Sequence, residues 1–330
     1  MKSFVKMLII LLPLCKIAVI QAQDVVYTQF YANPIYLNPA LAGSKLDQRL
    51  TLNYRNQWPN VKKGYVSYCA AWDKQFDKLS GGLGVIVTSD IGGDGMYNRL
   101  SANGIYSYRF HASRNIVINA ALQVGYLQYR LDWDKVVFGD QIDIHTGSLE
   151  PTMEYMPAKL NIGNVDFSAG VLGGYKESLY FGLAVNHLSR PDMAFYDGAE
   201  NKVQLRWTLH SGVLIDFFQG MQGEDLRNFS ISPNIIYVQQ GNFRQVNAGM
   251  YLNLFPYVIG AWMRHTIGNP DAIILLLGFQ QKDYKIGYSY DCTLSRLSPK
   301  SGGAHEISLA YLFPAHLDQK RFHKMRSPEF

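Results

Sequence analysis

The chain has 330 residues, of which 48% are hydrophobic, 13% aromatic and 17% charged. This composition favours strands and turns over a charged helical surface, and the many aromatic residues suit a membrane interface. The formal net charge of +5 falls by three, to +2, if Lys2, Lys6 and Lys16 are removed with an export leader. Nothing in this balance indicates a nucleic-acid partner, which needs a concentrated basic face.

Residues 1–22 have the features of an export signal peptide. Two lysines precede an apolar run at 7–14, and we expect cleavage after Ala22. The alternative is a lipoprotein modified at Cys15, which is disfavoured because Leu14 is larger than the small residue that normally precedes such a cysteine. A membrane anchor is disfavoured because the apolar run is shorter than the ~20 residues that span a bilayer.

The segment 23–45 follows the leader and shows no alternation of apolar and polar residues. Within Gln29–Gly43 it carries two Asn-Pro pairs, Asn33-Pro34 and Asn38-Pro39. Because proline locks φ and restricts the residue before it, these pairs predict turns and a fixed, compact path.

From residue 46 to 313 the dominant pattern is alternation with period two. In 49–55, for example, Leu50, Leu52 and Tyr54 alternate with polar residues, which indicates a strand with one apolar and one polar face. Similar runs predict fourteen strands, near 47–55, 65–73, 81–89, 98–109, 115–130, 165–176, 179–188, 204–217, 229–239, 243–254, 257–264, 272–282, 284–291 and 305–313. Two runs fit imperfectly: Ala272–Phe279 is apolar on both faces, and Pro233 interrupts a strand, which predicts a bulge or a strand end there.

The lengths of the connections distinguish a membrane barrel from a soluble β-sandwich. Links after even-numbered strands are mostly tight, with 218–228 as the main exception. Links after odd-numbered strands are mostly long: 90–97, 131–164, 189–203, 265–271 and 292–304. Short turns on one rim and long loops on the other are typical of an outer-membrane β-barrel, so we predict an all-β, transmembrane antiparallel barrel of about fourteen strands. A soluble periplasmic or surface β-protein is the alternative.

Motifs that carry chemistry are missing from the sequence. It contains no GxSxG, P-loop, HExxH or CxxC pattern, and its eight histidines are scattered. The acidic stretches Asp90–Asp94 and Asp140–Asp143 lack a full calcium-ligand pattern and are better explained as polar turns. After leader removal only Cys69 and Cys292 remain, so a disulfide framework is not expected. We therefore expect no catalytic residue, no metal site and no cofactor.

Several longer stretches of the sequence are distinctive. They are QFYANPIYLNPALAG (29–43), YRNQWP (54–59), FGDQID (138–143), NHLSRP (186–191), SYD (289–291) and GAHEISLAYLF (303–313). With them the chain resembles the PorP/SprF family of type IX secretion system membrane proteins of the Bacteroidetes, from the leader to Phe313. The resemblance implies a non-enzymatic outer-membrane barrel that works with the export and gliding machinery and helps secreted proteins or adhesins reach or stay on the cell surface. The implied partners are other type IX components, the C-terminal domains of secreted clients, and outer-membrane lipid.

Candidate contact residues follow from the two predicted surfaces of such a barrel. The segment 23–45 should begin in the periplasm, and Gln29–Gly43 should pack against the periplasmic mouth or enter the lumen; alternatively it only anchors the N-terminus. The turn and interface candidates are Asn33, Pro34, Asn38, Pro39 and Trp58. The alternation predicts lumen-facing Arg49, Arg55, Arg109, Arg206, Lys285, Asp291 and Glu306, whose positive bias suits an acidic polypeptide end or solute.

Two other functions remain open from the sequence. A porin or solute channel would use the same barrel, with lumen charges setting its selectivity. A barrel enzyme such as a lipase or protease would need a nucleophile and base aligned at one rim, for which only isolated Ser and His residues are available. The basic tail, 314–330, is expected to be solvated, with a docking arm for an acidic partner as the alternative.

Overall fold

The computed structural model describes residues 23–45, 48–62, 64–143, 145–176, 178–217, 229–267, 269–281, 283–294 and 298–313. The expected leader, the connection 218–228 and the basic tail lie outside these described residues. No helix within them is long and apolar enough to cross a bilayer.

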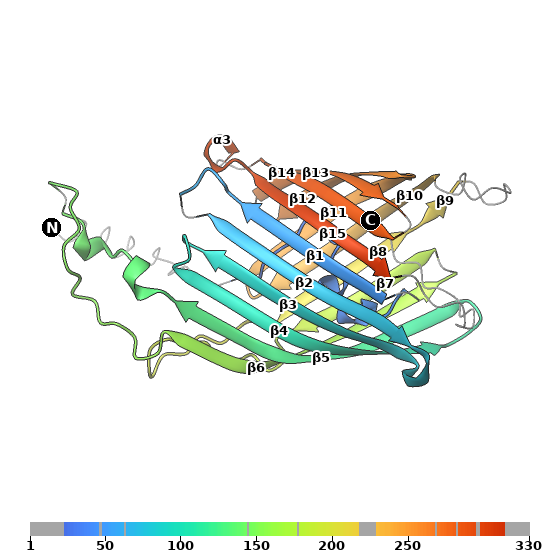
Figure 1. Cartoon of the computed structure of the whole chain (residues 1–330), viewed down its shortest axis with the longest axis horizontal. Helices are drawn as coiled ribbons and strands as arrows, with labels where there is room; N and C mark the ends of the chain where they lie inside the picture. Colours follow the sequence, from blue (N-terminus) through green and yellow to red (C-terminus); the bar gives the residue numbers. More distant parts are fainter. Residues whose placement is uncertain are drawn as a thin grey trace, which may run out of the picture.

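The described residues form a closed antiparallel β-barrel (Figure 1). Strands that follow each other in the chain pair with each other, apart from two short strands that share one partner. The last strand pairs with the first, from Gln48 opposite Phe313 to Gln57 opposite Ala304. The strands are β1 (Gln48–Gln57), β2 (Tyr65–Phe76), β3 (Gly81–Gly92), β4 (Tyr97–His111), β5 (Ile116–Leu131), β6 (Asn161–Tyr175), β7 (Leu179–Asn186), β8 (Arg206–Val213), β9 (Ile215–Asp216), β10 (Phe229–Gln240), β11 (Phe243–Leu254), β12 (Tyr257–Thr266), β13 (Asn269–Gln280), β14 (Tyr284–Thr293) and β15 (Ala304–Phe313).

The prediction of fourteen barrel strands is confirmed. β8 and β9 both pair with β10, in one register, and together make a single interrupted strand. The interruption lies opposite Ser232 and Pro233, whose pairing with β8 and β9 is missing although their pairing with β11 continues. Proline has no N–H to donate to a second neighbour, so Pro233 is accommodated at a break in the ladder.

The two faces of the wall follow the alternation in the sequence. On β1, Leu52 is 42% exposed on the outer face whereas Arg55 is 2% exposed on the inner face. Outer positions across the barrel carry large apolar side chains that lipid covers, and inner positions are mostly polar. Some strands are apolar on both faces: on β13, for example, Ile274 and Leu276 are buried on the inner face while Ile273 and Leu275 are exposed on the outer face.

The connections separate into two rims, as predicted, but two of the links predicted to be long are short. The predicted long link 90–97 contains only four unpaired residues, 93–96, because β3 continues to Gly92. We call the rim with 77–80, 112–115, 176–178, 255–256 and 281–283 the turn end, and the rim with 58–64, 93–96, 132–160, 187–205 and 294–303 the loop end. The long loop predicted at 265–271 was wrong, because His265 pairs with Pro270 and Thr266 with Asn269 beyond a bulge. The polar residues here belong to paired strand ends rather than to a loop, so polarity alone misplaced the strand boundary.

Candidate functional site

The segment 23–45 lies inside the barrel, and we call it the plug (Figure 1). It folds into two single turns, α2 (Pro34–Leu37) and the 3-10 turn η1 (Pro39–Leu41). A proline opens each turn, where its missing N–H costs nothing and its fixed φ suits the helix. The Asn38 side chain caps the second turn by accepting a 2.9 Å hydrogen bond from the Ala40 N–H. The two predicted Asn-Pro turns are therefore what compacts the plug.

The plug crosses the lumen from the loop end to the turn end, so the segment expected to begin on the periplasmic side starts instead at the rim of long loops. Asp24 contacts the loop-end residues Arg99 and His187, and Gly43 contacts Asp73 near the turn end, from which β1 starts back. Between these ends its large side chains are almost fully buried in one cluster with the barrel wall. Full burial of one such side chain contributes about 1.5–3 kcal/mol, so the plug is part of the hydrophobic core of the fold. Its buried apolar members are Tyr27, Phe30, Tyr31, Ala32, Ile35, Leu37, Ala40, Leu41 and Ala42.

A buried charge network holds the early part of the plug. Glu306 of β15 accepts hydrogen bonds from the Thr28 N–H at 2.7 Å and the Gln29 N–H at 3.1 Å. Arg55 lies 3.3 Å from Glu306 and 2.8 Å from Asp291. Carboxylates this deeply buried need both counter-charges and donors, and the wall and the plug supply them together. The plug backbone therefore completes a site that the wall alone leaves unsatisfied.

Aromatic packing fixes the middle of the plug. The Tyr31 hydroxyl is hydrogen-bonded to that of Tyr180, which in turn donates to Asn234. The Tyr31 ring lies 6.1 Å from Tyr251 and 6.5 Å from Trp262, measured between ring centroids. This packing explains why inner positions of the neighbouring β13 are apolar: they face plug and wall aromatics rather than water.

The turn end of the plug fits the wall closely. Asp73 accepts a 2.8 Å hydrogen bond from the Gly43 N–H and two 2.9 Å bonds from Arg49, while Arg109 donates to the Gly43 carbonyl at 2.8 Å. Gly43 has φ +64°, and a Cβ there would lie 2.5 Å from the Gly82 Cα. Only glycine fits this close approach with a left-handed backbone.

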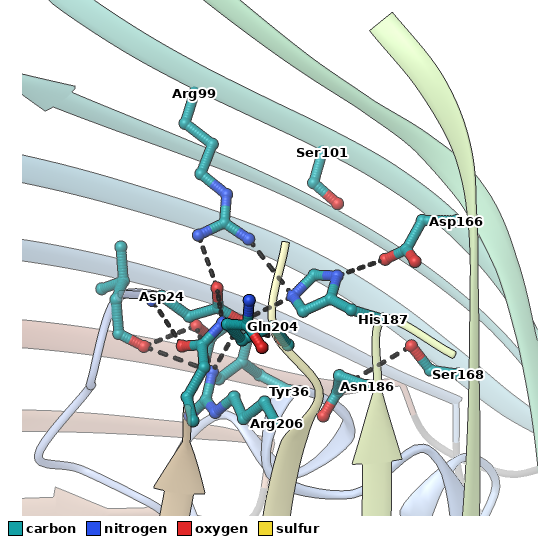
Figure 2. Close-up of polar contacts among 12 residues, drawn as sticks. Asp24, Tyr36, Arg99, Ser101, Asp166, Ser168, Asn186, His187, Gln204 and Arg206 are labelled. Atoms are coloured by element: carbon teal, nitrogen blue, oxygen red, sulfur yellow. Dashed lines mark hydrogen bonds and ion pairs between the residues drawn. The ribbon is translucent and has the colours of Figure 1, made fainter. Parts of the chain in front are cut away.

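The loop end holds Asp24 in a cluster of charged groups (Figure 2). Its carboxylate lies 2.6 Å from Arg99 Nη1, 2.8 Å from His187 Nε2 and 3.5 Å from Arg206 Nη1. The other ring nitrogen of His187, Nδ1, lies 2.6 Å from Asp166. With a carboxylate at each nitrogen, His187 is placed to donate two hydrogen bonds as an imidazolium.

The ionisation of this cluster follows from burial and charge. Burial alone would lower the pKa of His187, but the charge of Asp24 and the hydrogen bonds to Asp166 and Asp24 outweigh it and raise the pKa to about 9. Burial likewise would raise the pKa of Asp24, but Arg99, His187 and Arg206 hold it well below its usual range. At neutral pH the cluster is thus a set of opposite charges that holds the start of the plug at Asp24, which we call the plug tip, against the wall.

Beside this cluster is a small pocket, partly open to solvent. Its volume, including the open mouth, is about 580 Å³. Polar and charged groups from the plug, β3, β4, β6 and the loop after β7 line it: Asp24, Asp90, Arg99, Ser101, Asp166 and His187 among others. Within the described ranges, no three His, Cys, Asp or Glu side chains are grouped to hold a metal ion.

Eleven of the twelve candidate residues from the sequence are buried inside the barrel, yet they form no single site. The plug contributes Asn33, Pro34, Asn38 and Pro39, and the inner wall contributes Arg49, Arg55, Arg109, Arg206, Lys285, Asp291 and Glu306. Arg49, Arg55 and Arg206 bond to carboxylates of the chain itself, and Arg109 to Asn119, Gln75 and the Gly43 carbonyl. The arginines expected to attract an acidic client are therefore engaged internally.

Trp58 is the candidate that lies elsewhere. It is half-buried in the connection between β1 and β2 at the loop end, with its ring 6.0 Å from that of Tyr65. Its backbone N–H donates a 2.8 Å hydrogen bond to the Gly303 carbonyl at the same rim.

Sequence reasoning missed the residues that fasten the plug tip: Asp24, Arg99, Asp166 and His187. Arg99 and Asp166 lie in predicted strands, and His187 belongs to the quoted stretch NHLSRP. One feature of the sequence could have indicated this cluster: Asp24 is an acid in an otherwise uncharged stretch from Gln23 to Gly43. Such an isolated charge, in a segment with apolar side chains to bury, needs a partner of opposite sign.

Comparison with known proteins gives a family and a fold. A model of the family described as type IX secretion system membrane protein PorP/SprF matches residues 19–311. No curated protein matches the chain.

Among solved structures, the chain is similar to the toluene transporter TbuX of Ralstonia pickettii, with a TM-score of 0.50 and 10% identity over 86% of this chain and 93% of that one. The P. putida toluene transporter TodX gives a TM-score of 0.49 and 12% identity over 84% and 93%. The outer membrane protein Omp33 of Acinetobacter baumannii gives 0.46 and 6% identity over 82% and 100%. At these identities the TbuX likeness supports the barrel fold and nothing further.

Proposed function

Because the chain belongs to the PorP/SprF family of type IX secretion system membrane proteins, we propose that it is a non-enzymatic outer-membrane component supporting the export or surface attachment of particular secreted proteins. The barrel is the membrane anchor. The loop end is the side on which exported proteins arrive, since long loops of outer-membrane barrels face outward.

The observation that carries this proposal is the extent of the family match, which covers the plug and nearly the whole barrel rather than a shared fragment. The plug itself adds a physical argument. Its contacts run from Asp24 at the loop end to Gly43 at the turn end, and they use buried charges, aromatic stacking and close backbone approach. A lumen built around a fixed polypeptide suits a scaffold better than a solute path.

The main rival is a solute channel, because the structurally similar TbuX is a toluene transporter. A porin passes small ions at rest, whereas a plugged scaffold need not. Planar-bilayer conductance of the purified protein therefore separates the two. We expect little conductance from the intact chain and a large increase when residues 24–43 are deleted; steady wild-type conductance would favour the channel.

The direct test is deletion of the gene in its native host. We expect growth in rich medium to be largely unaffected while one or a few proteins disappear from the cell surface or medium. Quantitative proteomics of surface and secreted fractions measures this, with a strain complemented by the intact gene as the control. An unchanged surface and secreted proteome would contradict the proposal.

A further inference from the structure

Two loop-end connections, 132–160 and 187–205, carry large apolar side chains that are strongly exposed and lie away from the barrel. Figure 1 shows the connection between β5 and β6 extending far beyond the strands. Met153 is 90% exposed, Tyr155 87%, Leu149 64% and Met156 58%. These side chains lie outside the wall, so lipid does not account for them, and clustered exposed apolar groups mark interaction sites.

Hydrogen bonds hold these connections in a defined shape. The Asp140 carboxylate accepts hydrogen bonds from the Met153 N–H at 2.7 Å and the Thr152 hydroxyl at 2.9 Å. The Tyr196 hydroxyl donates to the Tyr155 carbonyl at 3.0 Å, which joins the second connection to the first. The apolar groups are thus displayed on a partly preorganised surface, and preorganisation reduces the entropy lost on binding.

The second connection is itself anchored to the barrel. Met193 is fully buried and Val203 nearly so, in a cluster with Leu127 and Tyr129 of β5. The second connection is therefore packed against the barrel wall at Met193 and Val203 as well as joined to it at its two ends.

The same two connections carry an excess of negative charge. They contain nine Asp and Glu against four Lys and Arg, whereas the rest of the chain contains 17 acids against 27 Lys and Arg. Three of the four cations are already paired within these loops: Lys135 with Asp132, Lys159 with Asp197, and Lys202 with Glu200. Among the described residues, Glu150 and Glu154 have no ion pair, and both are exposed next to the apolar groups.

From these observations we propose that connections 132–160 and 187–205 form a docking surface for a polypeptide segment that carries both Lys or Arg and large apolar side chains. Met and Tyr supply adaptable, amphipathic contact area, and the surrounding carboxylates select a basic partner and guide its approach. The negative surface repels anionic lipopolysaccharide, so a protein is the occupant that the charges favour. The inference rests on the proposed function and names the surface and partner chemistry through which it acts.

Site-specific photo-crosslinking in living cells tests the proposal. The intact protein carries Tyr155→p-benzoylphenylalanine, and the matched control carries the same amino acid at Met250, which is 52% exposed on the lipid face of β11. We expect a protein adduct from position 155 and none from position 250. Mass spectrometry of the linked peptide should show a segment with Lys or Arg among large apolar residues.

Two further variants show which groups attract the partner. The pair Glu150→Gln and Glu154→Gln, and separately Met153→Ser, should each reduce the adduct roughly tenfold, as loss of an interface hot spot does. Heat-modifiable migration of each variant on gels checks that its barrel is folded. Weaker crosslinking at high salt should accompany the charge effect, because exposed charges are screened.

Failure of this inference is distinguishable from failure of the proposed function. A lipopolysaccharide adduct, an acidic linked segment, or no adduct at position 155 overturns the docking surface, even if the deletion strain loses surface proteins. A basic, apolar adduct together with an unchanged surface proteome upholds the docking surface and refutes the role in export or attachment.

Discussion

The Thr28 N–H donates a 2.7 Å hydrogen bond to the Glu306 carboxylate across 278 residues of sequence. Glu306 lies in β15, the strand that pairs with β1 to close the barrel. The plug and the closing strand therefore share a buried charge, so that docking of the plug and closure of the barrel stabilise each other.

Replacing Glu306 with Gln should loosen the plug while the barrel stays folded. The amide carries no charge for Arg55 and presents a donor where Thr28 and Gln29 also donate. An unsatisfied buried group costs about 1–3 kcal/mol. The readout is maleimide labelling of Cys69 in a Cys292→Ser background, because Cys69 is 3% exposed in the cluster that the plug covers. We expect labelling about tenfold faster or more.

The exposed variant Glu154→Gln is the control for Glu306→Gln and should leave Cys69 protected. Equal protection of Cys69 in both variants would show that Glu306 does not hold the plug.

Replacing Asn33, Pro34, Asn38 and Pro39 with Ser should impair client delivery while the barrel still folds. The variant loses the two fixed turns and the Asn38 cap, so the plug has more conformational freedom to lose on docking. Heat-modifiable migration measures barrel folding, and surface proteomics measures delivery. If both are lost, or neither, the plug has no separate functional role.

Gly170→Ala should displace the plug from β6. A Cβ at Gly170 would lie 2.2 Å from Asn38 Oδ1 and 3.1 Å from Pro39 Cγ, whereas at Gly173 of the same strand the nearest atom is 3.9 Å away. Overpacking of this kind costs about 1–3 kcal/mol. Hydrogen exchange of the peptide 24–45 should be faster in Gly170→Ala and unchanged in Gly173→Ala, and identical exchange in the two would contradict the packing described.

Docking of the plug tip should weaken at alkaline pH. The pKa of His187 is raised to about 9, so its contribution is fully present below the ordinary value of about 6.5 and is lost as the pH rises through 9. The pKa of Asp24 is lowered, so its contribution is present above the ordinary Asp value and lost as the pH falls below it. Hydrogen exchange of residues 24–30, corrected for intrinsic rates, should therefore increase at both extremes. In His187→Gln the alkaline increase should disappear; its persistence would assign the effect to another group.

The double variant Cys69→Ser and Cys292→Ser should assemble normally. Both cysteines are free thiols, and Cys69 faces the lumen whereas Cys292 lies one residue before the end of β14, near the loop end. Heat-modifiable migration and membrane fractionation check assembly. A variant that fails to insert would reveal a structural need for one of the thiols.

The sequence by itself determined the barrel. Lipid outside and a mostly polar lumen inside impose period two on each strand, as in β1, where Leu52 faces out and Arg55 faces in. The parity of short and long connections then separated this barrel from a sandwich. The Asn-Pro pairs also predicted local turns, because proline acts through the backbone of its immediate neighbours.

Only the tertiary structure decided what the lumen contains. The plug has no periodicity, and its partners lie far along the chain: Asp24 meets His187 163 residues later and Arg206 182 residues later. The alternation identified the inner arginines, but it did not show that the chain's own groups already engage Arg49, Arg55, Arg109 and Arg206. Alternation fixes which way a side chain points relative to its own strand, whereas pairing across the lumen depends on closure of the whole ring, which no local pattern records.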